Sequence, residues 1–344
     1  MNYISGELKP YNAFASDLAQ LIPAVYISVP RDDPYTILNT ISDERLRLIH
    51  EGGFAYARGD FAKTIDCYKQ NKDDDAAKLC SSSVTIAAAI GAGDYPFYSE
   101  VETFLKNVIA ADINAGVTAL AELSLSTAYL GAMAPGMVPE WLKNGDFSAL
   151  PPQAKTDAAY KRAKYFQCTG DYNSMLVAAQ TALNFCDSPR EISFPGSYLR
   201  MMCAIACFEL ERHNEAEFWL SDAMKLNLPH GFVTCFAELI PLLGGMTERI
   251  LEREYPLYYR VVIDHQKRLF ANWVIFHNYI TNDMITHILS LRDYEIAQLA
   301  ARGVPYREIA KKFYVSEGRM RNIIKEIQSK LNINNKTELA KFVL

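Results

Sequence analysis

Residues 289–344 read LSLRDYEIAQLAARGVPYREIAKKFYVSEGRMRNIIKEIQSKLNINNKTELAKFVL. Ser290 followed by Asp293 resembles a capping box, and Gly303 is placed to end that helix because glycine adopts the left-handed conformation at little cost. Ser316 is a good cap for the helix that follows it. The stretch therefore predicts four helices: one that begins after Ser290, one at 306–313, one from 317 to about 331, and a short one framed by Asn335 and Glu338.

The third of these helices has two faces. At 100° per residue, one stripe is apolar and would face a core: Met320, Ile323, Ile324, Ile327 and Leu331. The opposite side is polar: Arg321, Asn322, Lys325, Gln328 and Ser329. Arg and Lys donate to guanine edges and Asn pairs with adenine, so this helix has the side chains that reading of the DNA major groove requires.

The whole stretch resembles the LuxR-type (GerE-like) helix-turn-helix of bacterial transcription regulators, without a gap. The matching positions are Leu289-Ser290, Arg292, Glu295, Gly303, Glu308-Ile309-Ala310, Val315-Ser316-Glu317, Arg321-Asn322, Ile327, Lys330-Leu331 and Thr337-Glu338. The resemblance implies that three residues face base edges: Arg321, Asn322 and Lys325. It also implies that Ser316, Arg319 and Lys330 touch phosphates, with Tyr306 and Arg307 nearby.

The stretch departs from the family pattern at a few positions, which concern the operator sequence rather than the fold. Asp293 stands where the family usually has Glu, and Ile323 replaces a common His. Gly318, Arg319 and Met320 replace a typical Lys-Thr-Val. Gly318 weakens the first turn of its helix by up to about 1 kcal/mol. The alternative to a DNA reader is a basic amphipathic helix packed inside a larger helical protein.

The charge is divided unevenly along the chain. Residues 289–344 carry 11 Lys and Arg and 6 Asp and Glu, a net charge of +5, whereas the first 288 residues carry 24 and 34, a net charge of −10. A basic tail on an acidic body is typical of one nucleic-acid-binding domain beside a domain with another task.

Length and composition fit a two-domain globular protein. The chain has 344 residues, of which 50% are hydrophobic and 22% charged. It has no apolar run of the roughly 18 residues that a membrane span needs and no leader-like N-terminus, so we expect a cytoplasmic protein. The seven cysteines form no CxxC pair and are expected to be reduced core residues; a metal or redox site at Cys203 and Cys207 is the weaker alternative.

Residues 41–254 have the pattern of stacked helical hairpins. Turn signals fall near Gly59-Asp60, Gly93-Asp94, Gly131, Gly170-Asp171, Glu211 and Gly244, at spacings of 34, 38, 39, 41 and 33 residues. This period is close to that of the tetratricopeptide repeat, and the segment resembles such a domain. Stacked hairpins form a superhelix whose concave surface binds a protein, peptide or small molecule. Alternatively, they serve only to space or dimerise the helix-turn-helix of residues 289–344, called here the reader.

Two further segments flank the repeats. We expect residues 1–40 to be irregular, apart from one possible helix at 11–22. Residues 255–288 form an aromatic helical connector, which we interpret as the seam between repeats and reader; a dimer contact or a ligand pocket is the alternative. The reader has its own start and stop signals, so we expect a fragment beginning near Asn282 to fold.

The sequence lacks the motifs of several enzyme classes. It has no phosphate-binding GxxxxGK[ST] loop and no HExxH, and its histidines are scattered. We therefore predict an all-α protein with no enzymatic activity, cofactor or metal: a sequence-specific transcription regulator that binds double-stranded DNA as a homodimer and receives a signal through its repeats. The alternative is a helical-repeat interaction scaffold whose helix-turn-helix no longer binds DNA specifically.

Overall fold

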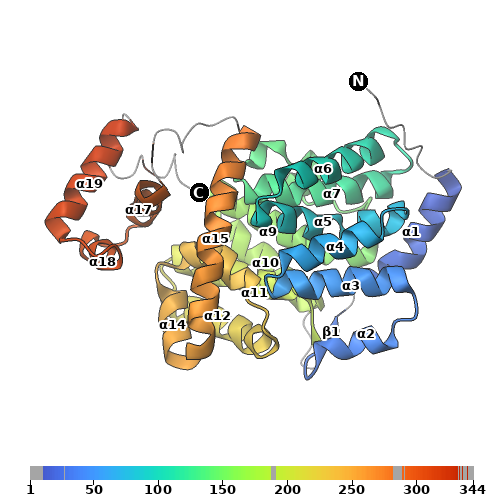
Figure 1. The fold of residues 1–344 in the computed structure, drawn as a ribbon, viewed down its shortest axis with the longest axis horizontal. Helices are drawn as coiled ribbons and strands as arrows, with labels where there is room; N and C mark the ends of the chain where they lie inside the picture. The colour runs from blue at the N-terminus through green and yellow to red at the C-terminus, as the bar shows by residue number, and fades with distance from the viewer. Residues whose placement is uncertain are drawn as a thin grey trace. The chain divides into compact units, whose positions relative to one another are not determined.

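The computed structural model describes residues 11–26, 28–186, 191–281, 289, 291–331, 333, 335 and 339. The chain forms two compact units, residues 1–131 with 135–235 and residues 132–134 with 236–344. The described residues are almost entirely helical, as the all-α prediction requires (Figure 1). Their strands are one antiparallel pair, β1 (Val29–Pro30) and β2 (Glu191–Ile192). No described helix is both long and apolar enough to cross a membrane.

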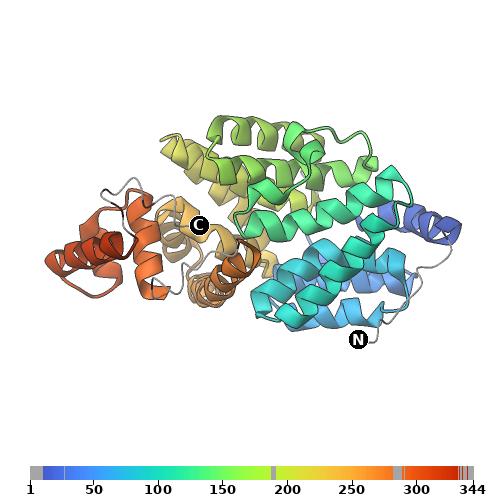
Figure 2. The same cartoon turned by 90° about the horizontal axis from the view of Figure 1, so that it is seen from above.

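The first unit consists of successive helices that pack on their neighbours in the chain (Figure 2). Their bounds are α1 (Tyr11–Val25), α2 (Ile37–Thr40), α3 (Glu44–Ala57), α4 (Phe61–Gln70), α5 (Asp75–Ala92), α6 (Tyr95–Ala110), α7 (Ala115–Gly131), α8 (Glu140–Asn144), α9 (Lys155–Thr169), α10 (Tyr172–Cys186), α11 (Phe194–Glu209) and α12 (His213–Asn227). Helices α3 and α4, α9 and α10, and α11 and α12 pack as hairpins, and α5 packs on α3 and α7.

Glycine–aspartate pairs make the turns between α3 and α4, between α5 and α6, and between α9 and α10, as predicted. Gly59, Gly93 and Gly170 all have a φ between +73° and +82°, the left-handed conformation that ends a helix. The following aspartate then caps the next helix: the carboxylate of Asp60 accepts a hydrogen bond from the Lys63 amide at 3.1 Å, for example. One dipeptide thus ends one helix and begins the next.

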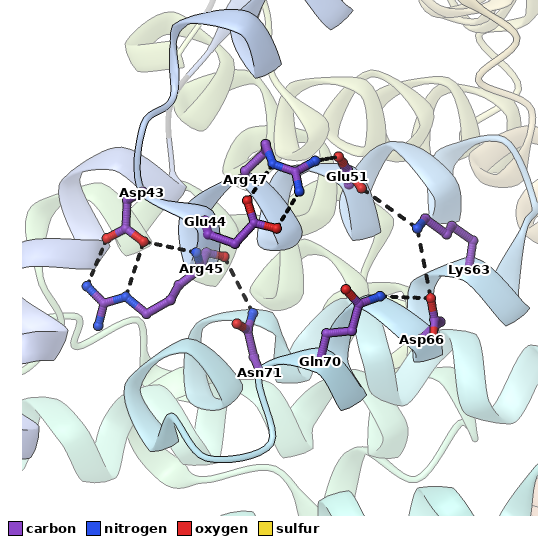
Figure 3. Close-up of polar contacts among 9 residues, drawn as sticks. All are labelled: Asp43, Glu44, Arg45, Arg47, Glu51, Lys63, Asp66, Gln70 and Asn71. Atoms are coloured by element: carbon purple, nitrogen blue, oxygen red, sulfur yellow. Dashed lines mark hydrogen bonds and ion pairs between the residues drawn. The ribbon is translucent and has the colours of Figure 1, made fainter.

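Polar contacts fix the outer side of the first hairpin (Figure 3). Arg47 pairs with both Glu44 and Glu51 along α3, and Glu51 reaches Lys63 of α4 at 3.8 Å. The side-chain amide of Asn71 donates to the Arg45 carbonyl at 3.4 Å. The Lys63–Glu51 ion pair and the hydrogen bond from Asn71 to the Arg45 carbonyl connect α3 and α4 at opposite ends of the hairpin.

Small residues let the paired helices approach closely. A Cβ placed on Gly52 of α3 would lie 3.4 Å from the Cys67 Cβ of α4. Cys203, Cys207 and Ala216 are fully buried between α11 and α12. The absence of larger side chains at these positions allows the helices of each hairpin to pack closely.

The described cysteines are free thiols that lie within helices or their packing surfaces. Burial raises the pKa of Cys80 to about 12 and that of Cys168 to about 11. A raised pKa lowers the thiolate fraction, and the thiolate is the reactive form. Four cysteines are buried, as predicted, whereas Cys80 and Cys168 are partly exposed; the side chain of Cys186 lies outside the described residues. The four are Cys67, Cys203, Cys207 and Cys235.

Residues 1–40 contain more structure than the single helix we expected. α1 is followed by β1, and η1 (Pro34–Thr36) begins after Asp33, whose carboxylate accepts from the Tyr35 amide at 3.0 Å. Phe14, Leu18, Leu21 and Ile22 of α1 are buried. Their spacing of four, three and one residues puts them on one helical face, which explains why α1 packs on α3 and α5.

Contacts between distant parts of the chain close the first unit. β1 pairs Val29 with Ile192, and the Thr234 hydroxyl donates to the Tyr56 carbonyl at 2.5 Å, across 178 residues of sequence. A small core of Phe54, Phe232 and their neighbours lies beside these bonds.

The second unit contains α14 (Met246–Glu254), α15 (Pro256–Thr281), α17 (Leu291–Ala301), α18 (Tyr306–Lys312) and α19 (Glu317–Lys330), and α13 (Thr234–Leu239) leads into it. The contacts thus group residues 236–254 with the C-terminal part, whereas the sequence pattern groups them with the repeats. The reason is that α14 packs on α15.

Candidate nucleic-acid interface

Helices α17, α18 and α19 pack around one core. α19 packs on both α17 and α18. Tyr294, Ile309 and Met320, one from each helix, are at most 1% exposed and belong to the same cluster. Gly303 ends α17 with a φ of +83°, as predicted, and the Val304 amide donates to the Leu299 carbonyl at 3.1 Å.

The turn between α18 and α19 is tight. Tyr314 has a φ of +54°, which is uncommon for a residue with a side chain, and its ring is 97% exposed. The amide of Val315 donates to the Ala310 carbonyl at 3.0 Å. The Ser316 hydroxyl accepts from the Arg319 amide at 3.2 Å, so the predicted cap of the third helix is confirmed.

The two faces predicted for α19 are confirmed. Met320, Ile323, Ile324 and Ile327 are at most 7% exposed and pack inside the core. The opposite face carries Arg321, Asn322 and Lys325, all exposed. Gly318 lies on this exposed face; apart from its chain neighbours and its own helix backbone, no atom of the described residues lies within 4 Å of where its Cβ would be. This face of α19 is therefore exposed at Gly318, Arg321, Asn322 and Lys325.

Several cations of this surface are held in exposed ion pairs. Arg321 pairs with Glu317 one turn earlier at 2.6 Å, and this hydrogen bond raises the pKa of Arg321. Lys330 reaches Asp293 of α17 at 3.1 Å, and Arg319 lies 3.7 Å from Glu326. Exposed pairs of this kind contribute about 0–1 kcal/mol, so a phosphate or a base edge can replace the carboxylate at small cost.

The remaining predicted positions lie at the start of α18 and in the middle of α19. Arg307 is exposed, whereas Tyr306 is half-buried against the core. Lys325 is exposed and forms no ion pair within the described part of the chain.

The structure adds residues of α15 that the sequence pattern did not assign to this domain. Val274 is fully buried in the reader's core, and Phe270 packs against it with its ring 5.6 Å from that of Tyr294. The aromatic spacing indicated a seam, but the sequence alone could not say which aromatic residue faces the reader. Tyr314 was also missed as a surface residue, because its position looks like a simple turn.

Another residue of α15 has an unusual pKa. His265 is 3% exposed, and the guanidinium of Arg268 donates to its Nδ1 at 3.3 Å. Burial, and then the nearby charge of Arg268, lower the pKa of His265 to about 4. The imidazole is therefore neutral at physiological pH.

Two predicted features lie outside the described residues: the Ser290 cap, and the fourth helix that Asn335 and Glu338 would frame, of which only residues 333, 335 and 339 are described. Leu339 is buried in the core of the reader.

The C-terminal part matches known proteins. Residues 287–343 match the family model of GerE, the bacterial regulatory proteins of the luxR family. A stretch of 52 residues is 46% identical to the "Uncharacterized transcriptional regulatory protein YvfU" of Bacillus subtilis (strain 168). That match covers 15% of this chain and 26% of the relative, so the chain spans about a quarter of the relative's length. No solved structure gives a significant match to the chain.

Proposed function

We propose that the protein is a sequence-specific transcription regulator that reads the DNA major groove with α19 and binds its operator as a homodimer. The observation that carries the proposal is the exposed set of Arg321, Asn322 and Lys325 on a helix whose other side is fixed in a core. The match of residues 287–343 to the luxR family supports it.

The three residues have the chemistry and the spacing for base reading. They stand at positions i, i+1 and i+4, so they project from one side of the first turns of α19. Arg321 and Lys325 donate to guanine, and Asn322 pairs with adenine through its amide. A buried stripe of four side chains holds their backbone in place, which lowers the cost of ordering them on DNA.

The phosphate contacts would flank this face. We assign Arg319 and Lys330 at the two ends of α19 and Arg307 on α18, with Tyr306 beside them. Ser316 fits the same role, because its oxygen accepts from the Arg319 amide and its O–H remains able to donate to a phosphate.

The helical hairpins of the first unit would receive the signal, from a protein, a peptide or a small molecule.

The alternative function is an interaction scaffold whose helix-turn-helix has lost specific DNA binding. Gly318 and Ile323, which depart from the family pattern, favour this alternative. Ile323 is 7% exposed and packs in the core. Having Ile here in place of the family's usual His therefore removes no side chain from the exposed face of α19. This observation favours the regulator.

Selection from random DNA sequences, followed by binding titration of the enriched site, tests the proposal. Arg321→Ala should weaken binding to the enriched site by about 1–3 kcal/mol and relax the preference at one base pair. Arg212→Ala is a matched control, because Arg212 is also exposed and paired with a glutamate, but lies in the first unit. A selection that enriches no sequence would support the scaffold instead.

A further inference from the structure

α15 has one face that carries exposed apolar side chains. Leu257, Val261, Ile275 and Tyr279 are 46–87% exposed. At 100° per residue they fall within about 40° of one another around the helix. Nine large hydrophobic side chains are exposed in the described part of the chain, and these four of them share one face of one helix. They form two apolar pairs near the two ends of the helix, with about 21 Å between Val261 and Ile275 at 1.5 Å per residue, so one elongated partner can contact both.

The opposite side of α15 is buried. Val262, Leu269 and Phe276 are buried, and Val274 packs in the reader's core. Leu257, Val261, Ile275 and Tyr279 are called here the α15 stripe. They lie on the exposed side of α15, the long orange helix of Figure 1, and the Tyr279 ring, 60% exposed, also stacks on Phe276.

The α15 stripe is symmetric about Arg268. Leu257 lies 11 residues before Arg268 and Tyr279 lies 11 residues after it, while Val261 and Ile275 are each 7 residues away. When two copies of the helix are placed antiparallel across a two-fold axis at Arg268, Leu257 meets Tyr279 of the second copy and Val261 meets its Ile275. A two-fold interface requires this kind of self-complementary surface.

Charge at the centre of the stripe is complementary in the same arrangement. Asp264 and Arg268 are both exposed and lie one turn apart. Antiparallel pairing puts each Arg268 about one turn from Asp264 of the second copy, so two carboxylates offset the repulsion between the two guanidinium groups. Within the described part of one chain Asp264 pairs with Arg260 at 3.5 Å, and an exposed pair of this kind can be exchanged at small cost.

We propose that the α15 stripe is the dimer interface of this protein, occupied by the α15 stripe of a second copy in antiparallel orientation. This inference rests on the proposed function, because it takes the homodimer from there and adds the surface through which the two copies associate. Because Val274 of the same helix packs in the reader's core, the two-fold axis would also relate the two readers.

Sedimentation velocity of the full chain without DNA measures the association. The unsubstituted protein should be a dimer at micromolar concentration, and the double variant Val261→Glu/Ile275→Glu should be a monomer. Val177→Glu/Phe218→Glu is the matched control, because these side chains are also exposed and apolar but lie on α10 and α12; it should remain a dimer. A monomeric parent, or a stripe variant that dimerises like the parent, overturns the proposal.

Disulfide crosslinking tests the register. Arg268→Cys should form a crosslinked dimer on mild oxidation, because residue 268 faces its own copy. Leu257→Cys should not, because its two copies lie about 33 Å apart along the paired helices at 1.5 Å per residue. The unsubstituted chain, with its native cysteines, is the control. Crosslinking at 257 without crosslinking at 268 overturns the antiparallel register.

Charge exchange provides a second test of the centre. Asp264→Arg alone should weaken dimerisation, and Asp264→Arg/Arg268→Asp should restore it, since the opposite charges face each other again. No restoration overturns the ion pairing. These measurements use no DNA, so their failure leaves the reading of DNA by Arg321 unaffected, and a failed DNA selection leaves the dimer unaffected.

Discussion

Deleting α15 should unfold the DNA-binding domain, although α15 lies outside the helix-turn-helix motif. Val274 is fully buried in that core, and Phe270 packs on Tyr294. Burial of a valine side chain contributes about 2 kcal/mol, and an aromatic pair about 1 kcal/mol more. Without α15 the domain is residues 289–344, and the single core of a domain that small rarely supplies more than about 3–5 kcal/mol of unfolding free energy. The loss of about 3 kcal/mol therefore leaves little or no stability.

Two fragments measure this effect. Residues 236–344 should unfold cooperatively in urea, as followed by circular dichroism, whereas residues 289–344 should be largely unfolded at 25 °C. This revises the expectation that a fragment beginning near Asn282 folds, because that fragment lacks both Phe270 and Val274.

A point substitution separates packing from chain length. Val274→Ala in the 236–344 fragment should lower the free energy of unfolding by about 2–3 kcal/mol, because it removes two buried methyl groups and leaves a cavity. Val261→Ala is the same chemical change at a half-exposed position of α15 and should cost less than about 0.5 kcal/mol in the dilute, monomeric fragment. Equal stability of the 236–344 and 289–344 fragments, or equal effects of the two substitutions, would refute the reasoning.

Three other predictions concern charge. Lys330→Ala should weaken binding to all DNA sequences alike and lower the salt slope by about one unit in titrations at several salt concentrations; a change confined to the enriched site would reassign Lys330 to base reading. Glu317→Gln should tighten DNA binding about two-fold, because it frees Arg321 from an exposed pair of about 0.3–0.5 kcal/mol; weaker binding would mean that Glu317 positions Arg321 rather than competing for it. His265 has a folded pKa of about 4, below its ordinary 6.5, so the stability it contributes is complete above pH 6.5 and decreases by up to about 3 kcal/mol as the pH falls to about 4. Urea unfolding across this range should show the loss, and His265→Gln should flatten it; an unchanged pH profile in that variant would show that another group titrates.

Local signals in the sequence were enough to predict the helix ends and the faces of α19. Gly59-Asp60 and Gly303 act through backbone conformation and first-turn capping, which depend on a few neighbouring residues. The stripe from Met320 to Ile327 follows from helical geometry alone. For the same reason the exposure of Arg321, Asn322 and Lys325 was predictable, while their roles on DNA stay predictions.

The tertiary structure decided what meets across long distances in sequence. Nothing near Val29 indicates that it pairs with Ile192, and nothing near Tyr56 indicates that its carbonyl receives the Thr234 hydroxyl. The aromatic pattern of 255–288 predicted a seam, but only the packing showed that Val274 completes the reader's core. The physical reason is that capping and helical periodicity are local properties of the chain, whereas a core is chosen by which surfaces bury each other, and many pairs of apolar faces in one sequence are equally able to do so.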